Sequence, residues 1–139
     1  MTQIQVESFG IIPLSHEHEI WKVCLVLHKS GNHWGFPKGR GQAGENPLTS
    51  AKRELKEETG LDVVRCLQDF PLIEHYQFRT SRGTVVKTVS YFPALVSGEL
   101  RLQEEEIREA RWMTFDEALK ALTFKEGRSL MNQLIKILK

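Results

Sequence analysis

Residues 39–61 read GRGQAGENPLTSAKRELKEETGL, and the fold can be argued outward from this stretch. Its apolar side chains recur at steps of three and four: Leu48, Ala51 and Leu55. This spacing predicts an amphipathic helix over residues 48–59, with Pro47 in its first turn and Gly60 as its C-terminal cap. A glycine-rich loop can turn backbone groups toward a ligand. The stretch therefore predicts a loop and helix that together form a binding element.

Three glutamates share one face of the predicted helix, because Glu54, Glu57 and Glu58 fall within an arc of about 100°. Crowded carboxylates repel one another unless a cation neutralises them, and such hard oxygen ligands suit Mg²⁺, with Mn²⁺ also possible. Arg53 lies four residues before Glu57 and can hold it in place. The alternative is a solvated helix face of lysines and glutamates. Glu45, a further acid at the end of the loop, favours the metal site.

The rest of the chain mixes strand and helix patterns. Strands are expected at residues 4–13, 21–28, 61–66, 74–78 and 85–96. The polar residues 15–19 are expected to form a solvated loop between the first two strands. Thr114 and Glu117 form a capping-box pattern that opens a helix through Leu122, and the apolar spacing over residues 130–138 predicts a C-terminal helix. This order predicts a layered α/β or α+β fold.

Composition limits the class of protein. A chain of 139 residues with 40% hydrophobic residues suits a single domain over residues 1–139. The 19 Lys and Arg balance 18 Asp and Glu, so neither DNA binding nor membrane binding is expected. No apolar run is long enough to span a membrane and no leader pattern opens the chain, which predicts a cytoplasmic protein. Cys24 and Cys66 lie far apart and are expected to be buried thiols rather than zinc ligands.

Residues 39–61 also match the signature of the Nudix hydrolases, G-x5-E-x7-R-E-U-x-E-E-x-G-U, in which U is a bulky apolar residue. The matching positions are Gly39, Glu45, Arg53, Glu54, Leu55, Glu57, Glu58, Gly60 and Leu61. The chain resembles that family without a departure from its pattern. The resemblance implies the Nudix fold, a mixed β-sheet sandwiched between α-helices, and cleavage of a nucleoside diphosphate linked to another group. We expect Glu54, Glu57, Glu58 and the Gly39 carbonyl to hold Mg²⁺.

The flanks resemble those of one group in the family, the asymmetrical diadenosine tetraphosphate (Ap4A) hydrolases. The likeness rests on residues 33–39 (HWGFPKG), 87–92 (KTVSYF), 109–112 (EARW) and 123–126 (TFKE). By position it implies that His33, Lys38 and Lys87 contact the polyphosphate, and that Tyr76 and Phe124 stack on a base. A place in the core is the alternative for either ring, and a solvated surface is the alternative for the lysines.

The expected substrate is a small dinucleoside polyphosphate, and the expected reaction converts Ap4A to ATP and AMP by attack of a metal-activated water on phosphorus. The general base is Glu54 or Glu106. Three alternatives stay open. The substrate could be an oxidised nucleoside triphosphate, an RNA 5′ end or a diphosphoinositol polyphosphate. The domain could be a nucleotide-binding Nudix domain without activity. The glycines at 39, 41 and 44 could belong to a dinucleotide-binding module, although no strand runs directly into them.

Overall fold

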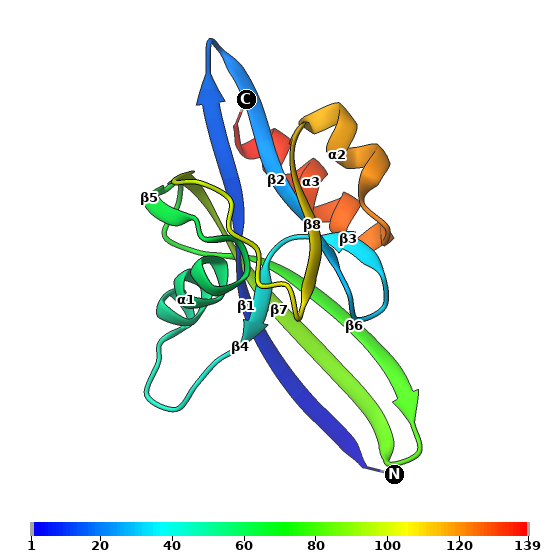
Figure 1. Ribbon diagram of the computed structural model, residues 1–139. Helices are drawn as coiled ribbons and strands as arrows, with labels where there is room; N and C mark the ends of the chain where they lie inside the picture. Colours follow the sequence, from blue (N-terminus) through cyan, green and yellow to red (C-terminus); the bar gives the residue numbers. More distant parts are fainter. Residues whose placement is uncertain (1, 139) are drawn as a thin grey trace.

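The computed structural model describes residues 2–138, which form one mixed sheet of eight strands together with three helices (Figure 1). In chain order the elements are β1 (Gln3–Glu17), β2 (Ile20–His28), β3 (His33–Gly35), β4 (Lys38–Arg40), α1 (Pro47–Thr59), β5 (Asp62–Cys66), β6 (Leu72–Thr80), β7 (Gly83–Ser97), β8 (Ile107–Thr114), α2 (Phe115–Ala121) and α3 (Lys125–Ile137). The mixed sheet between helices confirms the predicted α+β fold class. None of the described helices is long and apolar enough to cross a membrane.

Two long strands form the centre of the sheet. β1 runs parallel to β7 from the Gln3–Thr84 pair to the Leu14–Leu95 pair. The other edge of β7 pairs with β6 and then with β5, both antiparallel. The other edge of β1 pairs first with β4 and then with β2, which in turn pairs with β3 and β8. Because β1 changes partner along its length, β4 lies at the middle of the sheet, and α1 follows it.

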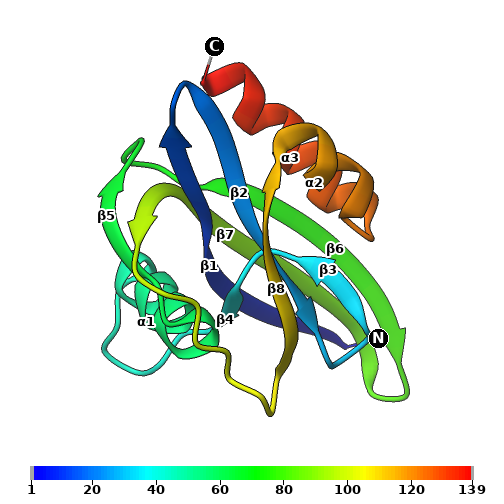
Figure 2. The ribbon, with the colours of Figure 1, turned by 45° about the horizontal axis from the view of Figure 1, so that its top comes forward.

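Alternate residues of β1 enter two separate cores. Ile12 and Leu14 pack in the cluster under α2 and α3, whereas Ile11 packs in the cluster under α1. Successive side chains of a strand point to opposite faces, so one strand can serve both cores. Figure 2 shows the result, with α1 on one side of the sheet and α2 and α3 on the other.

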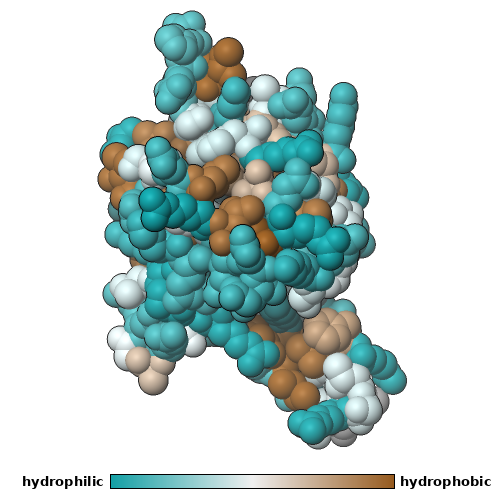
Figure 3. Space-filling view, viewed as in Figure 1, coloured by the Kyte–Doolittle hydropathy of each residue, from teal (hydrophilic) through white to brown (hydrophobic). Residues whose placement is uncertain are grey.

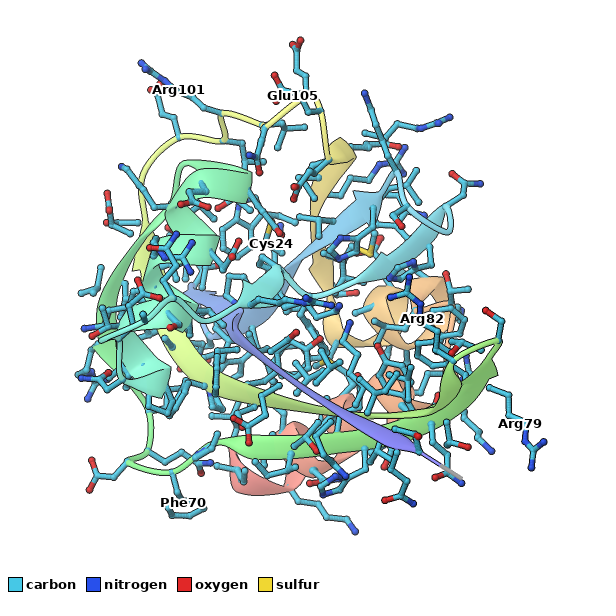
Figure 4. All side chains as sticks on the ribbon, turned by 90° about the horizontal axis from the view of Figure 1, so that it is seen from below. Cys24, Phe70, Arg79, Arg82, Arg101 and Glu105 are labelled. Carbon is cyan, nitrogen blue, oxygen red and sulfur yellow. The ribbon has the colours of Figure 1, made fainter. Side chains whose placement is uncertain are left out.

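The two cysteines are free thiols. Cys24 is buried, as expected, and lies in the interior near the middle of Figure 4. Its burial raises the pKa of the thiol to about 12, which makes it unreactive at neutral pH. Cys66 is half-buried.

The start of β1 and the β6–β7 hairpin project from the body as a three-stranded ribbon, at the lower right of Figure 1. Apolar side chains are visible on this ribbon in Figure 3, and Phe78 within it is 47% exposed. The base of the ribbon borders the site described below.

The predicted start and end of α1 are confirmed. The Asn46 side chain accepts a hydrogen bond from the Thr49 N–H at 2.9 Å, and Pro47 occupies the first turn. Gly60 adopts the left-handed conformation (φ 80°), and its N–H donates to the Lys56 carbonyl at 2.9 Å. These local caps fix the boundaries of the helix that carries the acidic face.

Replacing the cap should weaken the helix measurably. Asn46→Ala removes the acceptor for the Thr49 N–H, so we expect the free energy of unfolding to fall by about 1 kcal/mol. Urea denaturation followed by circular dichroism measures the change. Asn46→Asp keeps an acceptor and serves as the control. Equal losses in both variants would show that the cap does not stabilise α1.

The expected loop over residues 15–19 is wrong. β1 continues to Glu17 and β2 begins at Ile20, so only His18 and Glu19 form the turn, with φ values of 52° and 65°. Such two-residue turns with positive φ suit the twist of a tight hairpin. Neither residue is the usual glycine or asparagine, so the sequence carried no turn signal. Pairing across the strands stabilises the hairpin instead, since the rings of His16 and Trp21 stack at 4.1 Å.

Two further differences concern short or polar segments. The C-terminal helix begins at Lys125, ahead of the apolar spacing that predicted it, because its first turn is mostly polar. The three-residue strands β3 and β4 were not expected. They exist through pairing with β2 and β1, which local sequence does not encode.

Candidate active site

Arg53 is the centre of a hydrogen-bond network on the acidic face of α1. Its Nε lies 2.7 Å from Glu45 Oε2, and its Nη1 lies 3.1 Å from Glu57 Oε1 and 3.3 Å from Glu54 Oε2. Its Nη2 also donates to the Arg40 carbonyl at 2.9 Å. The hydrogen bonds from Arg53 lower the pKa of Glu45 to about 2. One guanidinium thus ties the glycine-rich loop to the helix and orients Glu57.

Glu58 and Glu54 lie deeper on the same face. Glu58 is only 2% exposed, and its Oε1 accepts a hydrogen bond from the Lys38 N–H at 3.3 Å. Burial, with the nearby Glu54 charge, raises the pKa of Glu58 to about 8. Burial also raises the pKa of Glu54. A Cβ on Gly39 would collide with the Glu54 carboxyl group, so glycine is what allows β4 to approach α1 this closely.

These observations test whether the acidic face fits a metal ion. Glu54 and Glu58 are hard oxygen donors whose charge is unfavourable in the protein alone, and a divalent cation would relieve that cost. Within residues 2–138, however, no three His, Cys, Asp or Glu side chains converge as a complete metal site. Glu57 instead accepts hydrogen bonds from Arg53 with both oxygens, at 3.1 and 3.2 Å. The donor set fits a divalent cation, provided that Glu57 turns from Arg53 toward the other two glutamates.

Glu106 lies near this face. Its negative charge contributes to the raised pKa values of both Glu54 and Glu58. Its backbone carbonyl accepts a hydrogen bond from the Lys29 N–H at 2.9 Å, which holds this end of the acidic loop against the end of β2. Glu105, by contrast, points away from the molecule in Figure 4. Of these two residues, Glu106 is therefore the one that lies near the acidic face.

A cavity of about 510 Å³ opens on the side of the sheet that α3 covers. All the predicted substrate contacts line it: His33, Lys38, Tyr76, Lys87 and Phe124. They come from β3, β4, β6, β7 and the start of α3. Lys38 belongs to both parts of the site, because its side chain lines the cavity while its N–H bonds Glu58.

The two lysines give the cavity a cationic end. Burial and the neighbouring Lys38 charge lower the pKa of Lys87. Neither lysine forms an ion pair with an acid in the described part of the chain. The Lys87 ammonium also lies 5.8 Å from the centre of the Tyr76 ring, on the paired strand. Two neighbouring ammonium groups without an acidic partner suit a phosphate chain.

The two predicted stacking rings differ in burial. Phe124 is 52% exposed, so the alternative that placed it in the core is wrong. Its ring lies 5.0 Å from that of His33. The adjacent Thr123 is tied to Trp34 by hydrogen bonds in both directions, at 2.9 and 3.4 Å, which fixes the start of α3 beside β3. Tyr76 is half-buried and packs at the edge of the α3-side core.

Sequence reasoning missed several residues that line the cavity: His28, Glu74, Tyr91 and Glu126. His28 lies opposite His33 on the paired strands, with the ring centres 4.7 Å apart, and its Nε2 lies 3.2 Å from the Phe36 carbonyl. Glu74 could have been found, because it lies two residues from Tyr76 and shares its face of β6. Tyr91 and Glu126 lie in the flanking stretches 87–92 and 123–126, whereas no local pattern marks His28.

The half-buried position of His28 should make stability depend on pH. Burial lowers the pKa of His28 to about 4, against an ordinary value of 6.5. Between these two values, the unfolded chain binds a proton at His28 and the folded protein does not. The contribution of this histidine to the free energy of unfolding is therefore fully present above pH 6.5 and is lost as the pH drops toward 4. Between pH 7 and 4.5, we expect this histidine to contribute a loss of about 2–3 kcal/mol.

His28→Gln isolates this effect, since the amide can still donate to the Phe36 carbonyl but does not titrate in this range. Chemical denaturation at pH 7 and at pH 4.5 should show a smaller loss in the variant than in the unaltered protein. Parallel losses would contradict the assignment.

Residues 5–134 match the NUDIX domain family. The asymmetrical bis(5′-nucleosyl)-tetraphosphatase of Mus musculus is 34% identical over 128 residues, which cover 88% of this chain and 84% of that protein. The RNA pyrophosphohydrolase of Sulfurovum sp. (strain NBC37-1) is 36% identical over 127 residues, with 81% of each chain covered. The crystal structure of a C. elegans Ap4A hydrolase binary complex shares the fold, with a TM-score of 0.72 at 20% identity over 96% of this chain and 97% of that chain.

Proposed function

Because the chain belongs to the Nudix hydrolase family, we propose that it hydrolyses dinucleoside polyphosphates and converts Ap4A to ATP and AMP with Mg²⁺ as its metal. Enzymes of this family use divalent metal ions. The observation that carries the proposal is the cavity. It brings together two unpaired lysines and two aromatic rings, groups suited to a phosphate chain and to a base, and the Lys38 N–H connects it to Glu58 on the acidic face of α1.

Each part of the site has a distinct task in this proposal. Glu54, Glu57, Glu58 and the Gly39 carbonyl would hold Mg²⁺, or Mn²⁺ in its place. That cation would neutralise the polyphosphate and make a water more acidic. Arg53 orients Glu57.

Lys38, Lys87 and His33 bind the phosphates, and the base stacks on Tyr76 and Phe124. Either Glu54 or Glu106 takes the proton of the attacking water. Burial raises the pKa of Glu54, and the Glu57 and Glu106 charges add to that rise.

An RNA 5′ end is the second candidate substrate. It is favoured by the RNA pyrophosphohydrolase relative, whose identity to this chain is similar to that of the tetraphosphatase. The Nudix signature residues serve both reactions, so only the products can separate them.

The test is a panel of substrates. Purified protein with Mg²⁺ is incubated with Ap4A, NAD, 8-oxo-dGTP and 5′-triphosphate RNA, and the products are identified by chromatography. We expect ATP plus AMP from Ap4A, at the highest kcat/KM of the panel. Two molecules of ADP, or a higher kcat/KM for the RNA, would overturn the proposal.

The role of Tyr76 can be tested separately. Tyr76→Ala removes a stacking surface, so KM for Ap4A should rise roughly 5- to 100-fold, while KM for an inorganic polyphosphate changes little. Phe70→Ala is a matched control, because Phe70 is 65% exposed and lies outside the residues that line the cavity (Figure 4). Equal effects of Tyr76→Ala on both substrates would remove this residue from the base site.

A further inference from the structure

The cavity carries charges of both signs that do not pair with one another. Lys38 and Lys87 line it together with Glu74 and Glu126. No ion pair among residues 2–138 involves any of the four, and no hydrogen bond reaches either glutamate carboxyl group. All four groups therefore remain available to a ligand.

Each carboxylate lies two residues from one of the two rings. Glu74 precedes Tyr76 by two residues on β6, so both side chains face the cavity. Glu126 follows Phe124 by two residues, in the first turn of α3. Glu74 and Glu126 line the same cavity, and the Glu126 charge helps to raise the pKa values of Glu74 and of Tyr76. The rings and the acids therefore line the same cavity.

An ionised carboxylate accepts hydrogen bonds and donates none. It repels a polyphosphate, so the phosphates of a bound nucleotide belong at the lysines rather than at Glu74 and Glu126. The part of the ligand that meets these acids must offer hydrogen-bond donors. A nucleotide has two such donors, the exocyclic amino group of its base and the hydroxyl groups of its ribose. The base is the part that stacks on Tyr76 and Phe124, whose elements also supply the acids.

We propose that Glu74 and Glu126 accept hydrogen bonds from the exocyclic amino group of the base stacked at Tyr76 and Phe124, and so select amino-bearing bases. This rests on the proposed function and deepens it, because it orients the substrate and names the feature of the base that is read. Adenine carries the amino group. Hypoxanthine, the base of inosine, has an oxygen in place of the amino group. This oxygen and the carboxylate would both be hydrogen-bond acceptors, so they could not bond each other.

The test compares kcat/KM for Ap4A with that for diinosine tetraphosphate. The unaltered protein should prefer Ap4A roughly 10- to 100-fold, the effect of a hydrogen bond to a charged acceptor. Glu126→Ala and Glu74→Ala should each reduce the preference by slowing Ap4A cleavage, with little change for the inosine substrate. The double variant should bring the ratio near one. Glu126→Gln keeps a carbonyl acceptor and should retain part of the preference.

Glu105→Ala is the matched control, since Glu105 lies on the loop that projects from the molecule and does not line the cavity (Figure 4). The ratio of kcat/KM for Ap4A to that for diinosine tetraphosphate should be the same in this variant as in the unaltered protein. Equal cleavage of both substrates by the unaltered protein would overturn the proposal, as would a preference that survives in the double variant. Thermal unfolding of each variant establishes that the fold is intact.

A third substrate separates the base from the ribose. If the effect of Glu126→Ala disappears with the 2′-deoxy form of Ap4A but persists with the inosine form, the acids bind the ribose and the proposal is wrong. If the protein cleaves none of these substrates, the proposed function has failed. The role of Glu74 and Glu126 can then still be tested by comparing the affinities for ATP and ITP by calorimetry. Tighter binding of ATP that is lost in the double variant would support the proposal, and equal affinities would refute it.

Discussion

Glu57→Gln should lower kcat by at least about 100-fold while the protein stays folded. The substitution keeps the size of the side chain and removes its charge, so Glu57 could no longer serve as an anionic ligand of the metal. The cost to stability should be small. The Glu57 side chain is 43% exposed and its ion pair with Arg53 lies at the surface, where such pairs contribute about 0–1 kcal/mol.

Steady-state kinetics over a range of Mg²⁺ concentrations, together with thermal unfolding, measures both parts of this expectation. Glu17→Gln is a suitable control, because Glu17 is exposed at the far end of β1 and lies outside the network. A variant at Glu57 with near-normal kcat would remove this residue from the proposed metal site.

Arg53→Ala should affect stability and turnover together. The Arg53 side chain is only 21% exposed and bonds Glu45, Glu54, Glu57 and the Arg40 carbonyl. Its loss leaves partly buried acids without their partner, so we expect the free energy of unfolding to fall by about 2–4 kcal/mol. Turnover should fall by at least about 100-fold, because Glu57 and the glycine-rich loop lose the group that orients them.

Arg53→Lys separates these two effects. Lysine restores the charge but has one nitrogen, whereas the guanidinium reaches its partners with Nε, Nη1 and Nη2. The lysine variant should therefore recover much of the stability and little of the turnover. Urea denaturation and kcat give the comparison. Full recovery of turnover would show that charge alone, rather than the planar group, is what the site requires.

The helix of the site could be predicted because its signals are local. The Asn46 cap, Pro47 and the left-handed Gly60 act within one turn of the chain, and the apolar repeat depends only on helix geometry. The contact of Arg53 with Glu57 follows from the same spacing. The strands with alternating apolar and polar residues were found for a similar reason, since this alternation follows from strand geometry and does not depend on which strand is the partner.

The turn at His18 and Glu19 and the short strands β3 and β4 could not be predicted in this way. Each is stabilised by pairing with another strand rather than by its own residue preferences. The sequence also left undecided whether Phe124 is exposed or lies in the core. Its position depends on the hydrogen bonds between Thr123 and Trp34, which are 89 positions apart in the chain.

The sequence by itself determined the family, the acidic face of α1 and the residue types of the site, because a fixed spacing on a helix is enough to gather them. The tertiary structure alone decided which charges face one another. The parallel pairing of β1 with β7, together with the packing of α3, brings β3, β4 and β6 to one cavity and places Glu74 and Glu126 in the same cavity as the unpaired lysines. No local pattern encodes that arrangement, since it depends on the register of strands far apart in the chain.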